Sequence, residues 1–134
     1  MRTYHDNSIV TSLPDNYIFV FGSNRAGRHG KGAALTAKRK FGAIEGTGYG
    51  LQGKSFGIPT KDRRLSVLPL SAISSYCSKL IALAKETPDV IYFVTEIGCG
   101  LAGYSPKDIA PLFKGAPDNL ELPISFHNHL EKLE

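Results

Sequence analysis

The chain has 134 residues, of which 42% are hydrophobic and 21% charged, and its formal net charge is +4. This length suits one domain with a core of its own, and the apolar content excludes a disordered chain. Two cysteines, a polar N-terminus and apolar runs far shorter than the roughly 20 residues of a membrane span argue against a secreted disulfide scaffold and a membrane protein. We therefore expect one cytoplasmic domain over residues 1–134, with its core at about 17–126 and a polar tail at 127–134.

The first half of the chain predicts two strands and a helix. Residues 17–21 form a continuous apolar run rich in strand-forming residues, which is typical of a strand buried on both faces. Residues 33–41 predict a helix that ends at Gly42. The glycines at 46, 48, 50 and 53 indicate a flexible stretch, and residues 55–60 predict a second strand that runs into Pro59.

The second half continues the alternation of helices and strands. Apolar residues at three- and four-residue spacing predict a helix over about residues 70–86, and residues 90–96 give the clearest strand pattern. Ser105 has the character of an N-cap, with Pro106 at the first helical position and Asp108 three residues after the cap. Residues 120–126 predict a last strand, residues 8–12 an additional edge strand, and the tail a frayed end or a short helix.

This order of elements predicts an α/β fold. Strands that alternate with helices are joined by right-handed crossovers, so the sheet is largely parallel and helices cover both of its faces. Ligands bind to such sheets beyond the carboxyl ends of the strands.

The positive charge is concentrated in residues 25–64. Ten lysines and arginines stand there against Glu45 and Asp62, so the segment carries +8 and the rest of the chain −4. This asymmetry favours an anionic ligand near the basic half. The alternative for Lys38–Lys40 is a solvated helix face.

Two glycine-rich loops each follow a predicted strand and precede a predicted helix. The first runs from Gly22 to Gly32 and the second from Gly98 to Tyr104. Glycine allows the backbone to approach a ligand closely, and successive N–H groups at a helix N-terminus can bind an anion. The first loop lacks the spacing of a nucleotide-binding P-loop, and the glycines at 46–50 follow a helix rather than a strand, so they fail the context of a dinucleotide-binding fingerprint.

Three motifs in order resemble the macrodomain family. They are Phe19–Asn24, which ends a strand in asparagine, then Gly30–Ala34, and then Ile97–Gly103. The Gly-Cys-Gly-Leu sequence at 98–101 and Pro59-Thr60-Lys61 are similar to the branch that contains the terminal ADP-ribose glycohydrolase and the DNA ADP-ribosyl-hydrolase antitoxins. The resemblance covers about residues 17–126. It implies a three-layer α/β/α sandwich with a mostly parallel mixed sheet, and a ligand of the ADP-ribose type.

The resemblance also assigns roles to single residues. Asn24 would contact the distal ribose, with Gly22, Ser23, Gly30, Lys31 and Gly32 along the same ribose and the diphosphate. The backbone N–H groups of the second loop would bind phosphate, which makes its residues the second half of the ligand site: Gly98, Cys99, Gly100, Leu101, Ala102, Gly103 and Tyr104. Lys61 matches the lysine that acts at the anomeric carbon in this branch. A lysine amine can attack such a carbon when neighbouring cations lower its pKa, and Arg63 and Arg64 stand close in sequence.

The sequence departs from this branch at two points. Ala102 stands where the hydrolases can place an aspartate directly after Gly-Cys-Gly-Leu, and no aspartate falls at an obvious position for reading adenine, with Asp15 as a guess. Three functions therefore stay open. The first is an ADP-ribosyl hydrolase acting on a modified protein side chain or nucleic-acid base, with Lys61 and Asn24 as its catalytic residues. The second is a non-catalytic reader or sponge of ADP-ribose-type nucleotides, and the third is a nucleic-acid-binding domain that uses the basic segment.

Other chemistry receives less support. Cys99 could be a nucleophile if a helix N-terminus lowered the pKa of its thiol, but no histidine stands where it could be a partner, and we expect only a small side chain in a tight loop. His127 and His129 are too few for a metal site, so we expect neither a metal nor a cofactor. Tyr49 and Tyr104 flank glycine loops and are either candidates for stacking on a base or ribose or ordinary loop aromatics.

Overall fold

The computed structural model describes residues 3–131 of the chain. The parts of the predicted domain and tail at residues 1–2 and 132–134 lie outside this range. The strands are β1 (Tyr4–His5), β2 (Tyr17–Asn24), β3 (Gly50–Gln52), β4 (Ser55–Lys61), β5 (Ile91–Val94) and β6 (Leu120–Pro123). The helices are α1 (Gly32–Lys40), α2 (Leu70–Glu86), α3 (Pro106–Ile109) and α4 (His127–Leu130), with 3-10 turns η1 (Ala110–Phe113) and η2 (Ile124–Phe126).

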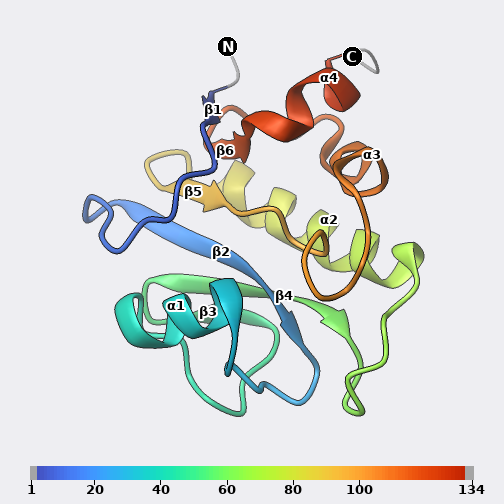
Figure 1. The fold of residues 1–134 in the computed structure, drawn as a ribbon. Coiled ribbons are helices and arrows are strands. Elements are labelled where there is room, and N and C mark those ends of the chain that lie inside the picture. The colour runs from blue at the N-terminus through green and yellow to red at the C-terminus, as the bar shows by residue number, and fades with distance from the viewer. Residues whose placement is uncertain (1–2, 132–134) are drawn as a thin grey trace.

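The six strands form one sheet in the order β1-β6-β5-β2-β4-β3 (Figure 1). Every neighbouring pair is parallel except β3 and β4, which are antiparallel. The prediction of an α/β fold with a mostly parallel mixed sheet is therefore confirmed. The described residues of the chain contain four α-helices besides this sheet.

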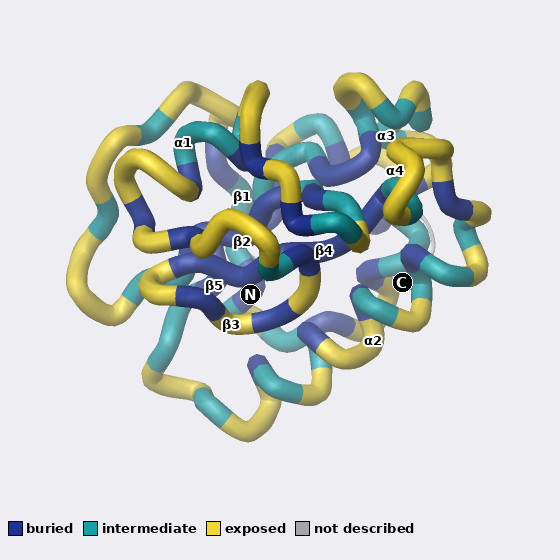
Figure 2. Tube along the Cα trace, turned by 90° about the horizontal axis from the view of Figure 1, so that it is seen from below, coloured by how far each residue is buried: buried dark blue, intermediate teal, exposed yellow. Residues whose placement is uncertain are grey.

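Alternate residues of the central strands contribute side chains to two separate hydrophobic cores. Phe19 and Phe21 pack with Ala34 and Ala37 of α1, whereas Val20, between them in sequence, belongs to the core that contains α2. Successive side chains of a strand point to opposite faces of a sheet, so α1 and α2 cover opposite faces. Figure 1 shows β2 and β4 running between these two helices. Figure 2 shows the central strands largely buried and the peripheral loops exposed.

The N-terminal segment joins the sheet earlier than the sequence indicated. The predicted strand at residues 8–12 is wrong, because those residues have no strand structure. Tyr4 and His5 pair instead with Leu122 and Pro123 of β6. The ring of His5 stacks on Phe93 at 3.9 Å between centroids. Two residues are too short to show the period of a strand, which explains the wrong position.

The glycine stretch predicted to be flexible is a packed part of the sheet. It contains β3, which turns back onto β4 in a tight hairpin. A Cβ on Gly48 would lie 2.0 Å from the carbonyl oxygen of Asn24, and one on Gly57 would lie 2.3 Å from the carbonyl oxygen of Gly48. Glycine is required here by close backbone contact rather than by flexibility.

The C-terminal elements are shorter than predicted. The strand β5 ends at Val94 rather than at residue 96, and β6 ends at Pro123, where the chain turns into η2. The capping box at Ser105 and Asp108 is confirmed, but the helix that it begins has only four residues before η1. The tail forms α4, whose Leu130 is fully buried, so the hydrophobic core extends beyond residue 126. No helix within residues 3–131 is long and apolar enough to cross a membrane.

Candidate functional site

A cavity of about 760 Å³ lies at the carboxyl ends of the central strands. Its walls come from the segments that follow β2, β4 and β5, from the start of α1 and from residues 7–10. The chain leaves β2 through α1 toward β4, and it leaves β5 toward β6 on the other side of the sheet. The cavity therefore lies where the strand order reverses, which is the usual ligand position in open α/β sheets. Its volume falls in the range of small-molecule sites.

Most of the residues that the sequence singled out meet at this cavity. Fourteen residues were assigned above to ligand binding or catalysis. Twelve of them line the cavity: Gly22, Ser23, Asn24, Gly30, Lys31, Gly32, Lys61, Gly98, Cys99, Gly100, Leu101 and Ala102. Gly103 and Tyr104 do not. The hydroxyl of Tyr104 donates a hydrogen bond to the carbonyl oxygen of Leu68 at 2.6 Å, and its ring packs against the core on the α2 side. Tyr104 thus anchors the second loop instead of facing the cavity.

The second glycine loop leaves a row of backbone donors without protein acceptors. Cys99 N–H donates to the carbonyl oxygen of Glu96, so the expected phosphate contact from that group is not free. Gly103 N–H donates to Gly100 and Tyr104 N–H to Gly98, which closes the loop. The N–H groups of Gly98, Gly100, Leu101 and Ala102 in this loop have no acceptor among residues 3–131. Such a row of unpaired N–H groups is an anion-binding arrangement.

The start of α1 adds a second group of donors. Its N-cap, Lys31, makes no side-chain capping bond, and its first turn contains no acidic residue. Gly32, Ala33 and Ala34, the first residues of the helix, all line the cavity. The first N–H groups of a helix have no partner within it and carry a partial positive charge. The cavity is therefore bordered by two sets of unpaired backbone donors, one in the loop after β5 and one at the start of α1.

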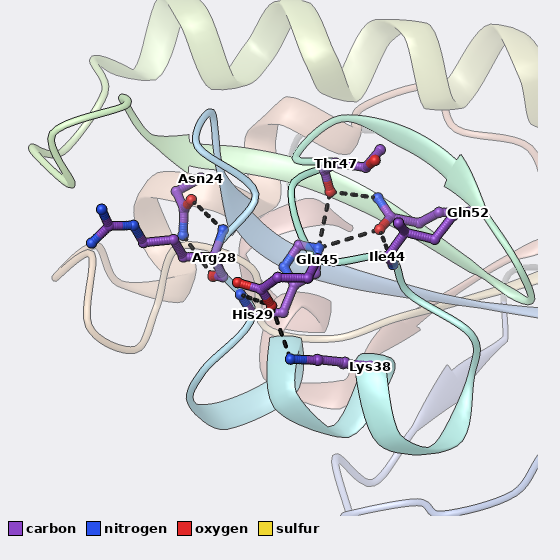
Figure 3. Close-up of polar contacts among 8 residues, drawn as sticks. All are labelled: Asn24, Arg28, His29, Lys38, Ile44, Glu45, Thr47 and Gln52. Atoms are coloured by element: carbon purple, nitrogen blue, oxygen red, sulfur yellow. Dashed lines mark hydrogen bonds and ion pairs between the residues drawn. The ribbon is translucent and has the colours of Figure 1, made fainter.

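Asn24 fixes the loop that leads to α1 (Figure 3). Its Oδ1 accepts from the backbone N–H of Arg28 at 3.0 Å, and its Nδ2 donates to the carbonyl oxygen of Arg28 at 2.9 Å. Both polar atoms of the side chain are engaged in this pair, with one Nδ2 hydrogen left over. Asn24 lines the cavity, and in this structure it acts first as the clamp of its own loop.

The buried His29 holds the same loop from the inside (Figure 3). Its Nε2 lies 2.9 Å from the carbonyl oxygen of Thr47 and 3.2 Å from Oε1 of Gln52, so Nε2 carries the hydrogen. The backbone N–H of His29 donates to Glu45, which also pairs with Lys38 of α1 at 3.1 Å. The hydrogen bond from Lys38 lowers the pKa of the Glu45 carboxyl. These contacts join the loop, α1 and the β3 hairpin.

Lys61 reaches the cavity because β4 is irregular at its end. The register shifts between Ser23 and Asn24, so that Ser23 pairs with Pro59 while Asn24 pairs with Lys61. Both Asn24 and Lys61 then line the cavity. Among the described residues, the amino group of Lys61 has no hydrogen-bond or ion-pair partner.

The charge around the cavity is positive. Arg28, Lys31 and Lys61 line it, and Glu96 is the single acidic residue among its described lining residues. Glu96 is already engaged, since its Oε1 accepts from Nδ2 of Asn7 at 2.7 Å and its Oε2 from the hydroxyl of Ser125. Arg63 and Arg64, expected to assist Lys61, lie exposed in the following turn and do not line the cavity.

Sequence reasoning missed the contribution of residues 7–10. These residues line the cavity because β1 adds to the sheet beside β6 and carries the chain over the end of β5. The N–H of Asn7 donates to Nδ1 of His5, whose Nε2 in turn donates to the carbonyl oxygen of Val94. The sequence gives no signal for it, because Tyr4-His5, which precedes the polar pair Asp6-Asn7, is too short to show the pattern of a strand.

The remaining candidates lie outside this chemistry. Burial, together with the negative charges of Glu96 and Asp108, raises the pKa of the Cys99 thiol to about 12, which contradicts an activated nucleophile. Tyr49 packs beside Tyr76 on the α2 side, away from the lining residues of the cavity. No group of three or more His, Cys, Asp or Glu residues within 3–131 is placed to hold a metal ion.

Comparisons of the chain with protein-family models, with curated proteins and with solved structures find no match.

Proposed function

We propose that this chain binds ADP-ribose or a closely related nucleotide, in a three-layer α/β/α sandwich of the macrodomain type. The observation that carries the proposal is the row of unpaired N–H groups at Gly98, Gly100, Leu101 and Ala102. A diphosphate would supply the acceptors that these groups lack, and hydrogen bonds to a charged acceptor are among the strongest in proteins. The uncapped start of α1 and the cations Arg28 and Lys31 favour the same ligand charge.

The two ends of the cavity differ in character. With the diphosphate at the Gly98–Ala102 loop, the distal ribose lies toward Asn24 at the end of β2 and Lys61 at the end of β4. The nucleobase lies toward residues 7–10, next to the aromatic side chains of Phe19 and Phe93, which also line the cavity. An aromatic and aliphatic surface with a few polar groups suits a base.

Calorimetric titration of the purified protein tests the proposal. ADP-ribose should bind saturably with one site per chain, ADP more weakly because it lacks the distal ribose, and AMP more weakly still because it lacks the diphosphate. No heat of binding at millimolar ADP-ribose would overturn the proposal. Equal affinity for AMP and ADP-ribose would show that the loop is not a diphosphate site.

Hydrolysis of a bound ADP-ribosyl group is the second candidate, and the free amino group of Lys61 in the cavity favours it. In this reaction Nζ of Lys61 forms a bond to the anomeric carbon while the bond to the attached group breaks. The electron pair leaves with that group, which takes the proton lost by the amine. Water then cleaves the adduct, releases ADP-ribose and restores the lysine.

Ala102 bears on whether the chain hydrolyses ADP-ribosyl groups or only binds them. No carboxylate follows Leu101 in the loop, and Glu96 is held by Asn7 and Ser125, so the described lining residues offer no free carboxylate as a base. This favours a reader of ADP-ribose over a hydrolase. Release of ADP-ribose from a modified peptide and a modified oligonucleotide, measured for wild type, Lys61→Ala and Lys61→Arg, decides between them. Turnover that both variants lose identifies the lysine mechanism, and no turnover by wild type identifies a reader.

A further inference from the structure

The backbone adopts the left-handed region at two non-glycine residues within 3–131, Asn7 with φ 65° and Leu65 with φ 66°. Both residues line the cavity. Asparagine enters this region readily, because its short polar side chain bonds locally. Leucine does so rarely, and a bulky residue there is a genuine outlier that calls for an explanation.

The turn after β4 forces Leu65 into this conformation. Oδ1 of Asp62 accepts hydrogen bonds from the N–H groups of Arg64 at 2.8 Å and Ser66 at 2.9 Å. The N–H of Leu65 donates to the carbonyl oxygen of Asp62 at 3.1 Å, and the N–H of Asp62 donates to Ser66 at 2.8 Å. A bridge between Lys61 and Val67 closes the base of the turn. The position of Leu65 is therefore fixed before any ligand arrives.

A leucine is unfavourable at this position for two independent reasons. The conformation suits glycine or asparagine, and the side chain keeps 40% of its surface exposed although it lines the cavity. Either substitution would remove the strain and the exposed apolar surface. Strain of this kind persists most often at ligand sites, where the side chain has a task.

We propose that Leu65 determines specificity for the distal ribose, by packing its side chain against the carbon face of that sugar beside Lys61. This inference rests on the proposed binding of ADP-ribose and names the residue that recognises its far end. A ribose ring presents C–H groups on one face, and an aliphatic side chain covers them without competing for the hydroxyl groups. The contact would bury the surface of Leu65 that is exposed without ligand.

Titrations of ADP-ribose and ADP against matched variants test the inference. Leu65→Ala should weaken ADP-ribose binding about tenfold, which is the loss expected for the uncovered apolar surface, and should leave ADP binding unchanged. Val67→Ala is the control, because Val67 belongs to the same turn, is 47% exposed and does not line the cavity. This variant should bind both ligands as wild type does.

Leu65→Gly adds a readout that a merely structural role would not give. Glycine accepts the left-handed backbone, so the midpoint of thermal unfolding should rise by about 2–4 °C in the absence of ligand. The same variant should lose ADP-ribose affinity as strongly as Leu65→Ala. Higher stability together with weaker binding would support a residue kept for its ligand.

Each result bears on one of the two proposals. If wild type binds ADP-ribose and the Leu65 variants bind it equally well, the inference is overturned while the proposed function stands. If the Leu65 variants lose ADP and ADP-ribose to the same degree, Leu65 does not recognise the distal ribose and the inference is again overturned. If wild type binds neither ligand, the proposed function itself fails and the inference fails with it.

Discussion

Replacement of Gly100 by valine tests the phosphate loop most directly. Gly100 lies in the middle of the row of unpaired donors and lines the cavity. A Cβ built on it meets no atom within 4 Å, and its φ lies outside the left-handed region. The fold therefore accepts a side chain here, and we expect the free energy of unfolding to change by no more than about 0.5 kcal/mol.

The same substitution should remove most of the ligand affinity. The open space beside Gly100 is the space that a phosphate would need in order to reach the neighbouring N–H groups. Hydrogen bonds to a charged acceptor contribute about 1.5–3 kcal/mol each, so the loss of one or two of them, about 1.5–6 kcal/mol, weakens binding by roughly 10- to 10⁴-fold. Titration of Gly100→Val with ADP-ribose measures this loss, and circular dichroism melting measures stability on the same sample. Affinity within threefold of wild type would refute the assignment of this loop to the diphosphate.

Gly103 provides the matched control, and Gly98 provides a second test within the row. Gly103 has φ 87° and does not line the cavity, so Gly103→Ala should cost about 1 kcal/mol of stability and leave the affinity of the folded protein unchanged. Gly98 has φ 74°, and a Cβ there would lie 3.0 Å from Cδ1 of Ile109. Gly98→Ala should therefore lower both stability and affinity.

Three further predictions concern single residues of the fold. Because the pKa of Cys99 is raised to about 12, its thiolate makes up about one part in 10⁴ at pH 8. Alkylation of Cys99 by iodoacetamide should therefore be about 10³-fold slower than that of a free cysteine and should accelerate as the pH rises toward 12, and alkylation at the free-cysteine rate in the folded protein would contradict this. Nδ2 of Asn119 lies within hydrogen-bond distance of the carbonyl oxygens of Ala84, Thr87 and Val90. Asn119→Ala should therefore lower the free energy of unfolding by about 2–3 kcal/mol in urea denaturation, and a change below about 0.5 kcal/mol would show that solvent replaces these bonds. Gly48→Ala should lower the free energy of unfolding by more than about 3 kcal/mol, since its Cβ would lie 2.0 Å from the carbonyl oxygen of Asn24. A melting temperature equal to that of wild type would contradict the tight packing of the β3 hairpin.

The sequence predicts the central elements well, because they depend on local pattern. The apolar run at residues 17–21 lies within β2, and the amphipathic stripe at 70–86 coincides with α2. Because both glycine-rich loops follow strands, the sequence also predicts correctly that most of their residues lie together, and the structure places them at one cavity. These features follow from the period of the chain and from the rule that parallel strands end at one edge of the sheet.

The features that the sequence missed depend on contacts between distant segments. Two residues of β1 become a strand because β6 is available to pair with them, and residues 7–10 reach the cavity for that reason. By composition alone, the glycines of the β3 hairpin resemble a flexible linker. Only the fold shows that the backbone of Asn24 packs closely against Gly48. Tyr104 looks like a ligand residue by its position after the loop, but its hydroxyl finds Leu68 across the fold.

The unpaired donors of the site result from how the two loops satisfy their other groups. The second loop is closed by its own hydrogen bonds, in which the N–H groups of Cys99, Gly103 and Tyr104 donate to the carbonyl oxygens of Glu96, Gly100 and Gly98, respectively. The remaining N–H groups of this loop have no acceptor among the residues that the structure describes. In the first loop, the reciprocal bonds of Asn24 with Arg28 and the buried ring of His29 hold the chain that leads into α1. A ligand that meets such loops spends little of its binding free energy on ordering them. If the proposed nucleotide binds, the contacts that hold the loops would contribute to its affinity through the geometry they maintain.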